Sequence, residues 1–493
     1  MTSTVNIPFD NSFSQLPEQF YTRQAPVPVA APKLIKVNEG LATLMGIDPV
    51  ALKSDDGVQM LAGNSVPDGA SPLAMVYAGH QFGGWSPRLG DGRAILLGET
   101  VGTDGIRRDI HLKGSGRTPY SRGGDGRAWL GPVLREYVIS EAMAALDVPT
   151  TRPLSVVATG ENIIRNGQEP AAIVCRTARS HLRVGTFQIA AASCAIESLR
   201  ALADFAIDRL YSDAPKTGPE RYAYFLRQVI AGQADLISKW MGYGFIHGVM
   251  NTDNACISGE TIDYGPCAFM DDFHPGKVFS SIDRNGRYAW NRQPEIAQWN
   301  MVRLAETLLP LLGDTEEQQQ AAAEAQLATF SPLFAERFND VMAKKFGLPN
   351  GDALKPEFLA ETFETMTTGQ VDFTLFFRHL TLVAGGGETG DFVSLFNDKT
   401  FGTTWLNNWK MQTGFAKQLN TEQLVQMRGA NPIIIPRNHR IEEAIADANA
   451  GNLETFKRLF KAVTTPFEER AEYDAYENPP KVDEVVWQTF CGT

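Results

Sequence analysis

The stretch Tyr243-Gly-Phe-Ile-His247-Gly-Val-Met-Asn-Thr-Asp253-Asn254, followed by Ile262-Asp263-Tyr-Gly-Pro266, gives the clearest indication of a fold. A protein-kinase catalytic loop reads His-Arg-Asp, four further residues and Asn, and an Asp-Phe-Gly motif follows it. Counted from His247, Asn254 falls on the kinase asparagine, and Asp263 begins the counterpart of Asp-Phe-Gly. Asn and Asp side chains supply the hard oxygen ligands that Mg²⁺ prefers. The stretch therefore predicts a kinase-like cleft that binds ATP and magnesium.

The catalytic aspartate of the kinase loop is missing. Its position holds Val249, whose side chain cannot accept a proton. Asp253 is the nearby carboxylate that could replace it as a general base. A plainer interpretation is that these Asn and Asp residues only form turns, as they commonly do in loops. The order of the motifs along the chain favours the catalytic interpretation.

A lysine and a glutamate upstream predict an ion pair. Lys113 ends the alternating run 108–113, which is typical of a strand. Glu136 lies on the helix predicted at 131–146, where apolar residues recur at helical spacing. Kinase-like sites use a strand lysine held by a helix glutamate to direct an ammonium group at nucleotide phosphates. The two residues are therefore candidates for that pair.

Two other motifs suit phosphate. In Leu89-Gly-Asp-Gly-Arg93, glycines would let backbone N–H groups approach phosphate, although such a turn more often only closes a hairpin. Arg176, Arg179 and Arg183 follow in a segment without acids, and guanidinium groups bind phosphate oxygens well. A solvated helix face is the alternative interpretation of these arginines.

Composition narrows the class of protein. The chain has 493 residues, of which 43% are hydrophobic and 21% charged, as in ordinary globular proteins. Its net charge of −12 argues against nucleic-acid binding. The N-terminus does not resemble a secretory signal, and no apolar run is long enough for a membrane span. The five scattered cysteines suggest a reducing compartment, so we expect a cytoplasmic monomer.

The pattern along the chain predicts an α+β protein with a kinase-like, two-lobed fold. Residues 1–70 contain a Pro-rich run and are expected to form an irregular N-terminal arm. Residues 71–175 predict the N-lobe, with short strands and one helix. Residues 176–300 would form the core of the C-lobe, with the catalytic loop and activation segment. Residues 301–493 are expected to form a helical C-terminal extension and a tail.

Longer strings point to a family. The sequence resembles the selenoprotein O family of kinase-like proteins over nearly its whole length, in a bacterial form with cysteine in place of selenocysteine. The strings that carry this resemblance are Tyr77-Ala-Gly-His-Gln-Phe-Gly84, Leu89-Gly-Asp-Gly-Arg93, Leu112-Lys-Gly-Ser-Gly-Arg-Thr-Pro-Tyr-Ser-Arg122, Gly124-Asp-Gly-Arg-Ala128, Leu134-Arg-Glu-Tyr137, His247-Gly-Val-Met-Asn-Thr-Asp-Asn254, Asp263-Tyr-Gly-Pro266, Asn431-Pro432 and Pro436-Arg-Asn-His439.

The resemblance implies protein adenylylation. Members of the family bind ATP in the reverse orientation to kinases and transfer AMP to Ser, Thr or Tyr hydroxyls of target proteins, releasing pyrophosphate. It implies that Asp253 is the base, that Glu136 pairs with Lys113, and that Asn254 and Asp263 bind Mg²⁺, or Mn²⁺ in its place. The residues implied to hold ATP are Gly90, Gly92, Arg93, Lys113, Asp125, Gly126, Arg176 and Arg183.

The resemblance also implies a redox switch and redox-related target proteins. Cys491 stands where animal members have selenocysteine, and related bacterial proteins can pair a C-terminal cysteine with one in the activation segment. Cys267 is the candidate partner in this chain. In the other alignment of this segment the partner position holds Ser280 or Ser281, which would leave no switch.

Two other functions compete with adenylylation. An ordinary protein kinase would transfer the γ-phosphate instead of AMP. A non-catalytic ATP-binding scaffold would use the helical C-terminal half to dock partners. UTP or another nucleotide could also replace ATP as the donor.

Overall fold

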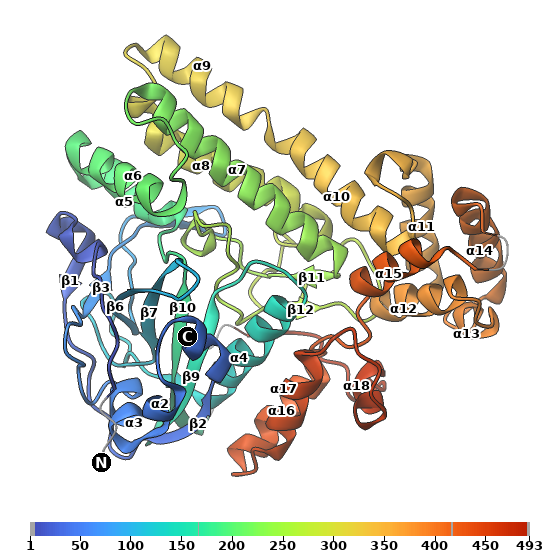
Figure 1. Cartoon of the computed structure of the whole chain (residues 1–493), viewed down its shortest axis with the longest axis horizontal. Coiled ribbons are helices and arrows are strands. Elements are labelled where there is room, and N and C mark those ends of the chain that lie inside the picture. The colour runs from blue at the N-terminus through green and yellow to red at the C-terminus, as the bar shows by residue number, and fades with distance from the viewer. Residues whose placement is uncertain (1–4, 166, 416–417, 491–493) are drawn as a thin grey trace.

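The computed structural model describes residues 5–165, 167–415 and 418–490 of the chain. Sheet and helices occupy different parts of the molecule, so the expected α+β class is confirmed. Figure 1 shows the sheet at one side with α4 (Leu130–Ala145) beside it, and the long helices α7 (Pro219–Gly242) and α10 (Phe330–Phe346) beyond. None of the helices in the described ranges is long and apolar enough to cross a membrane.

The larger sheet is antiparallel and follows the order β1-β3-β6-β7-β10-β9-β2, with β8 paired to β10. The strand predicted at 108–113 is confirmed as part of β7. The strand bounds are β1 Tyr21–Arg23, β2 Lys33–Val37, β3 Leu73–Met75, β6 Ala94–Val101, β7 Arg107–Lys113, β8 Ala128–Trp129, β9 Arg152–Ile164 and β10 Gln168–Ala178.

The first 70 residues differ from the irregular arm that we expected. β1 and β2 are the two edge strands of the main sheet, and short helices α1 (Glu39–Leu44), α2 (Pro49–Lys53) and α3 (Asp55–Leu61) follow them. Pro26, Pro28 and Pro32 of the Pro-rich run lie between β1 and β2, so they break the chain between two strands without preventing either. Each short helix begins at a side-chain cap, formed by Asn38, Asp48 and Ser54.

Helix α4 is confined between the sheet and the C-terminal helices. It packs on β9 and β10 with one face, and on α16 (Asn438–Asn449) and α17 (Glu454–Val463) with the other. The Tyr137 ring of α4 lies 5.4 Å from the Phe460 ring of α17. Nearly every side chain of α4 is buried as a result. The C-terminal residues therefore fix the helix that carries Glu136.

The helical part is built around α7, which packs on α8 and α10. Two small sheets connect it to the site: β4 (Gly79–Gln81) pairs with β5 (Gly84–Ser86), and β11 (Phe245–Ile246) pairs with β12 (Ala268–Phe269). The other helices are α5 Val184–Ser193, α6 Ile196–Leu210, α8 Gln293–Leu308, α9 Glu316–Leu327, α11 Pro356–Gly369, α12 Phe373–Ala384, α13 Gly390–Val393, α14 Lys399–Thr413, α15 Thr421–Ala430 and α18 Asp474–Glu477.

A buried arginine joins the last helices to the rest of the molecule. Arg437, directly before α16, is 1% exposed. Its guanidinium pairs with Asp271, which follows β12, and lies 2.7 Å from Asp372 at the start of α12. It also donates to the Glu477 carbonyl at 3.1 Å. One cation thus balances two carboxylates from segments far apart in the sequence.

We expect Arg437→Ala to destabilise the protein, because it leaves the Asp271 and Asp372 carboxylates facing each other without a cation. Removing one partner of a buried ion pair costs about 3–5 kcal/mol, which a thermal or urea unfolding midpoint would detect. Arg292→Ala is the matched control, since Arg292 pairs with Glu295 at the surface and such pairs contribute about 0–1 kcal/mol. Equal midpoints for the two variants would contradict the prediction.

Candidate active site

A cavity of about 290 Å³ lies between the main sheet and the loop at 247–254. It gathers the residues that the sequence suggested for nucleotide, metal and base, although they come from separate parts of the chain. These residues are Gly90, Gly92, Arg93, Lys113, Asp125, Gly126, Arg176, Arg183, Asp253, Asn254 and Asp263.

The predicted lysine–glutamate ion pair is present. Lys113, at the end of β7, bonds to the Glu136 carboxylate of α4 and lies 3.4 Å from Asp263. Arg176 of β10 approaches the other Glu136 oxygen at 3.3 Å. Burial disfavours the charged form of Glu136, but Lys113 and Arg176 outweigh it and hold the pKa of Glu136 below its usual value. Glu136 is therefore ionised and fixes both cations beside the cavity.

Two oxygen donors fit a divalent cation. Asn254 donates its amide N–H to the Val249 carbonyl at 3.0 Å, which leaves its amide oxygen for a ligand. Burial opposes ionisation of Asp263, but Lys113 and Arg93 hold the pKa of this carboxyl well below its usual range. In the described residues no group of three or more His, Cys, Asp or Glu side chains could hold a metal. Two protein oxygens suit Mg²⁺, which keeps several waters and binds substrate phosphates.

The Asp263 backbone is held in an unusual conformation. Its φ angle is +67°, a left-handed value that is uncommon for residues other than glycine. The preceding Ile262 carbonyl bonds to the His247 ring at 2.8 Å, and that ring stacks on Trp240 at 5.1 Å. These contacts position the Asp263 carboxylate at the cavity. His247 therefore orients the segment that carries Asp263 without lining the cavity itself.

Asp253 lies on a short 3₁₀ turn, Thr252–Asn254, at the edge of the cavity. Its Oδ2 atom accepts a hydrogen bond from the Gln81 amide at 3.1 Å, and its buried Oδ1 atom has no hydrogen-bond partner. Burial raises the pKa of this carboxyl above its usual value. A group of this kind can accept a proton, which Val249 beside it cannot.

The hairpin β4–β5 was missed as part of the site. Besides the Gln81 contact with Asp253, the His80 N–H donates to the Thr252 hydroxyl at 2.7 Å. The Phe82 N–H donates to the Asn251 side chain at 2.9 Å. The string at 77–84 is distinctive in the sequence, but its contacts lie roughly 170 positions away. The hairpin thus covers and orients the catalytic loop.

A buried polar chain behind the cavity was also missed. His111 lies between Asp91 of the glycine-rich turn, at 3.1 Å, and Arg176, at 3.2 Å. Burial lowers the pKa of His111, so the ring is neutral and serves Asp91 as donor and Arg176 as acceptor. The alternation of side chains along the strand could have predicted this role for His111, because residues 111 and 113 point to the same face of β7.

The glycine-rich segments that line the cavity need glycine for steric reasons, because they pack closely on neighbouring backbone. A side chain at Gly92 would place its Cβ atom 2.8 Å from the Tyr120 carbonyl, and one at Gly126 would collide with the Gly116 backbone. Asp125, next to Gly126, forms a two-pronged ion pair with Arg165 at 2.8 and 2.9 Å. Arg183 is buried beside the cavity: it stacks on Tyr77 at 4.3 Å and donates to the Asp253 carbonyl at 3.1 Å.

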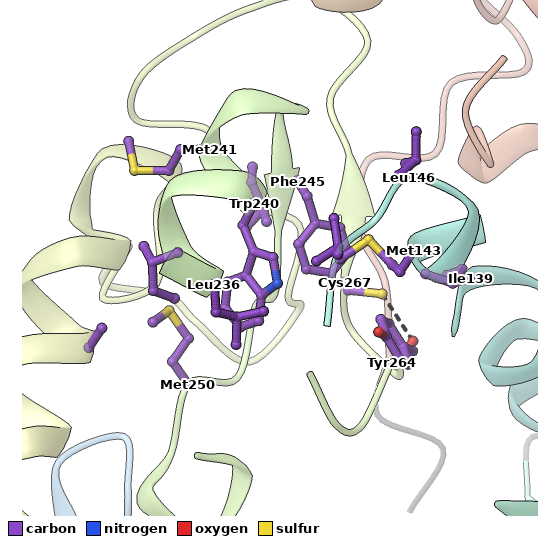
Figure 2. Close-up of a cluster of buried hydrophobic side chains, with 14 of the residues drawn as sticks. Ile139, Met143, Leu146, Leu236, Trp240, Met241, Phe245, Met250, Tyr264 and Cys267 are labelled. Carbon is purple, nitrogen blue, oxygen red and sulfur yellow. Dashed lines mark hydrogen bonds between the residues drawn. The ribbon is translucent and has the colours of Figure 1, made fainter. Parts of the chain in front are cut away.

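The candidate redox pair stays a prediction, because Cys491 lies outside the described residues. Figure 2 shows the Cys267 thiol in the apolar core, near Met143, where it donates a hydrogen bond to the Tyr264 carbonyl. Burial raises the pKa of this thiol to about 12, so it resists forming the thiolate that disulfide exchange requires. Thr489 of the tail pairs with Ser280 and donates to the Pro266 carbonyl at 2.6 Å. The tail therefore runs beside both segments considered as its partner.

Known proteins resemble this chain over nearly its whole length. The family model "Protein adenylyltransferase SelO" matches residues 3–464. The chain belongs to this family. It is 51% identical over 496 residues, 99% of this chain and the whole of the relative, to "Protein nucleotidyltransferase YdiU" of Rhodopseudomonas palustris strain HaA2. Proteins of the same name from Bradyrhizobium diazoefficiens and Bradyrhizobium sp. strain BTAi1 are also 51% identical, over 494 and 495 residues. The protein is thus an enzyme, a nucleotidyltransferase.

One residue of α4 ties the turn after Asp263 of this SelO-family enzyme to the C-terminal helices. Arg135, beside Glu136, donates to the Gly265 carbonyl at 3.0 Å and to the Cys267 carbonyl. The same guanidinium donates to the Asn438 side chain of α16 at 2.7 Å. It therefore holds the turn that follows Asp263.

We expect Arg135→Ala to weaken metal-dependent nucleotide binding by about 10- to 100-fold, because each lost charged hydrogen bond is worth about 1.5–3 kcal/mol. Calorimetric titration of ATP at fixed Mg²⁺ would measure the loss. Asn438→Ala is the control: it removes the α16 contact but keeps both carbonyl contacts, and should change affinity much less. The prediction is wrong if Arg135→Ala binds as the parent protein does.

Proposed function

We propose that this protein transfers AMP from ATP to Ser, Thr or Tyr hydroxyls of target proteins and releases pyrophosphate. The observation that carries the proposal is Asp253 at the cavity edge, with valine at the kinase base position beside it. We also propose a kinase-like, two-lobed arrangement, in which the main sheet and α4 form one lobe. The Lys113–Glu136 ion pair between strand and helix supports this view.

The arginines favour AMP transfer over γ-phosphate transfer. Arg176 and Arg183 are 5% exposed and line the cavity, so their charges act where water is largely excluded. As a leaving group, pyrophosphate carries more negative charge than ADP does. Guanidinium groups bind such oxygens in pairs, which Lys113 alone would not do.

The chemical step needs one proton acceptor and one leaving group. The acceptor hydroxyl oxygen forms a bond to the α-phosphorus, and its proton passes to Asp253. The bond from the α-phosphorus to the bridging oxygen breaks, and pyrophosphate leaves with that electron pair. Gln81 holds one Asp253 oxygen, and the other has no hydrogen-bond partner among the described residues. A cation bound by Asn254 and Asp263 would neutralise phosphate charge.

The two competing functions fit the site less well. A kinase needs a carboxylate or an equivalent group where this chain has the apolar Val249. A scaffold that only binds ATP needs no buried Asp253 carboxylate with an unpartnered oxygen, which costs free energy to keep. ATP is the proposed nucleotide donor and UTP is the alternative. Transfer from labelled ATP compared with transfer from labelled UTP distinguishes the two donors.

Labelled nucleotides decide between these functions. With a protein extract as acceptor, we expect label from α-labelled ATP on protein and none from γ-labelled ATP. Asp253→Asn should slow transfer by about 10²–10⁴-fold, the usual contribution of a general base, while ATP still binds. Asp253→Asn keeps the shape of the side chain, so it is its own steric control. Label from the γ position alone indicates a kinase, no label indicates a scaffold, and labelled UTP in parallel tests the donor.

Metal removal gives a separate test. We expect a chelator to abolish transfer and excess Mg²⁺ or Mn²⁺ to restore it, because Asn254 and Asp263 provide oxygen ligands that suit both ions. Asp263→Asn should need a much higher metal concentration for half-maximal rate. Transfer that persists in the chelator at full rate would rule out the proposed metal dependence.

A further inference from the structure

An aromatic cluster extends from the β4–β5 hairpin to α8, outside the nucleotide cavity. His80 of β4 lies 4.9 Å from the Trp85 ring of β5 and 5.2 Å from the Trp299 ring of α8. Trp85 is 45% exposed, a large fraction for tryptophan in a site so well packed. The cluster is tied to the catalytic loop, because Asn300 beside Trp299 donates to the Met250 carbonyl at 3.1 Å.

Two arginines stack on Trp299, and they differ in one respect. Arg303 lies 5.1 Å from the ring and pairs with Glu306 at 2.7 Å. Arg287 lies 5.0 Å from the same ring, and no ion pair to it is found in the described ranges. Its Nε atom is buried without a hydrogen-bond partner. Arg287 is therefore a positioned cation without an ion pair in the described ranges, since the nearby Asp283 carboxylate accepts from the backbone N–H groups of Arg287 and Tyr288.

Arg287 is also fixed relative to the catalytic loop. Its neighbour Tyr288 donates to the Asn251 side chain at 2.7 Å, the same oxygen that the Phe82 N–H contacts. The guanidinium carbon lies 3.5 Å from the place where a side chain at Gly83 would begin, so the hairpin tip and Arg287 are in contact. The cation thus adjoins the hairpin that holds Asp253.

We propose that Trp85, Trp299 and Arg287 form an acceptor-docking surface for the protein segment that carries the target hydroxyl. The segment it fits has an Asp or Glu close to that hydroxyl. This inference rests on the proposed function and adds the class of acceptor. A guanidinium that is held on an aromatic ring binds a carboxylate with little further loss of freedom. Exposed tryptophan supplies the apolar contact typical of binding sites for protein segments.

The nucleotide does not account for this surface. Trp85, Trp299 and Arg287 are not among the residues that line the cavity, so ATP has its own arginines. The whole protein carries a net charge of −12, and an acidic segment would therefore be repelled over most of its surface. A local cation beside the base would guide such a segment to the hydroxyl-accepting position. Charge complementarity, and contact with the loop that carries Asp253, argue for the acceptor as occupant.

Synthetic peptides test the surface directly. Fluorescein-labelled peptides carrying Ser, Thr or Tyr, with flanking residues either acidic, neutral or basic, are titrated with the full-length protein and followed by anisotropy. We expect acidic flanks to bind about tenfold more tightly than neutral ones, as one desolvated charge pair provides. Arg287→Ala should abolish this preference, and Arg287→Glu should reverse it in favour of basic flanks. Arg303→Ala, which alters a paired arginine on the same ring, should keep it.

Transfer assays distinguish the two proposals. With α-labelled ATP, Arg287→Ala and Trp85→Ala should raise the KM for acidic peptides about tenfold and leave the KM for ATP unchanged. Both substitutions lie at partly exposed positions outside the cavity, and unfolding midpoints check that the variants fold. Charge-selective binding without any AMP transfer would reject the proposed function but keep the surface. Transfer that is indifferent to flanking charge and to Arg287 would overturn the surface but keep the function.

Discussion

The buried cluster of Lys113, Glu136 and Arg176 is the constraint on which the rest of the site depends. Moving charges out of water is costly unless each has a partner, so this cluster exists only if β7, β10 and α4 meet at one point. Strands β7 and β10 are neighbours in the sheet, which brings Lys113 and Arg176 together. The packing of α4 against the sheet supplies the carboxylate, and Asp263 completes the cluster from the catalytic half.

The two halves of the site are joined by polar contacts of different kinds. On one side Arg135 reaches from α4 to the turn after Asp263 and to α16. On the other side the β4–β5 hairpin bonds to the catalytic loop through Gln81 and backbone N–H groups. The cavity is thus closed by contacts between segments far apart in sequence. This arrangement keeps the proposed metal ligands and the proposed base in register.

The sequence predicted the parts of the site that depend on local pattern. The spacing from His247 to Asn254 and Asp263, and the strand that ends at Lys113, are short-range features, and the structure has them in the expected elements. The edge strands β1 and β2 were not predicted, because three to five residues between prolines give no clear period and pair only through β3 and β9. Arg287 was not singled out, because its significance lies in a missing partner, which no sequence pattern displays.

The position of α16 and α17 against α4 has a consequence for how the enzyme is made. A ribosome releases the chain from its N-terminal end, so the sheet, α4 and the catalytic loop all emerge before Asn438. Until then one face of α4 stays uncovered, and Arg135 lacks its Asn438 contact. A chain that ends before Asn438 therefore lacks the packing of α16 and α17 on α4. The order of synthesis therefore completes the packing around α4 only when translation is nearly finished.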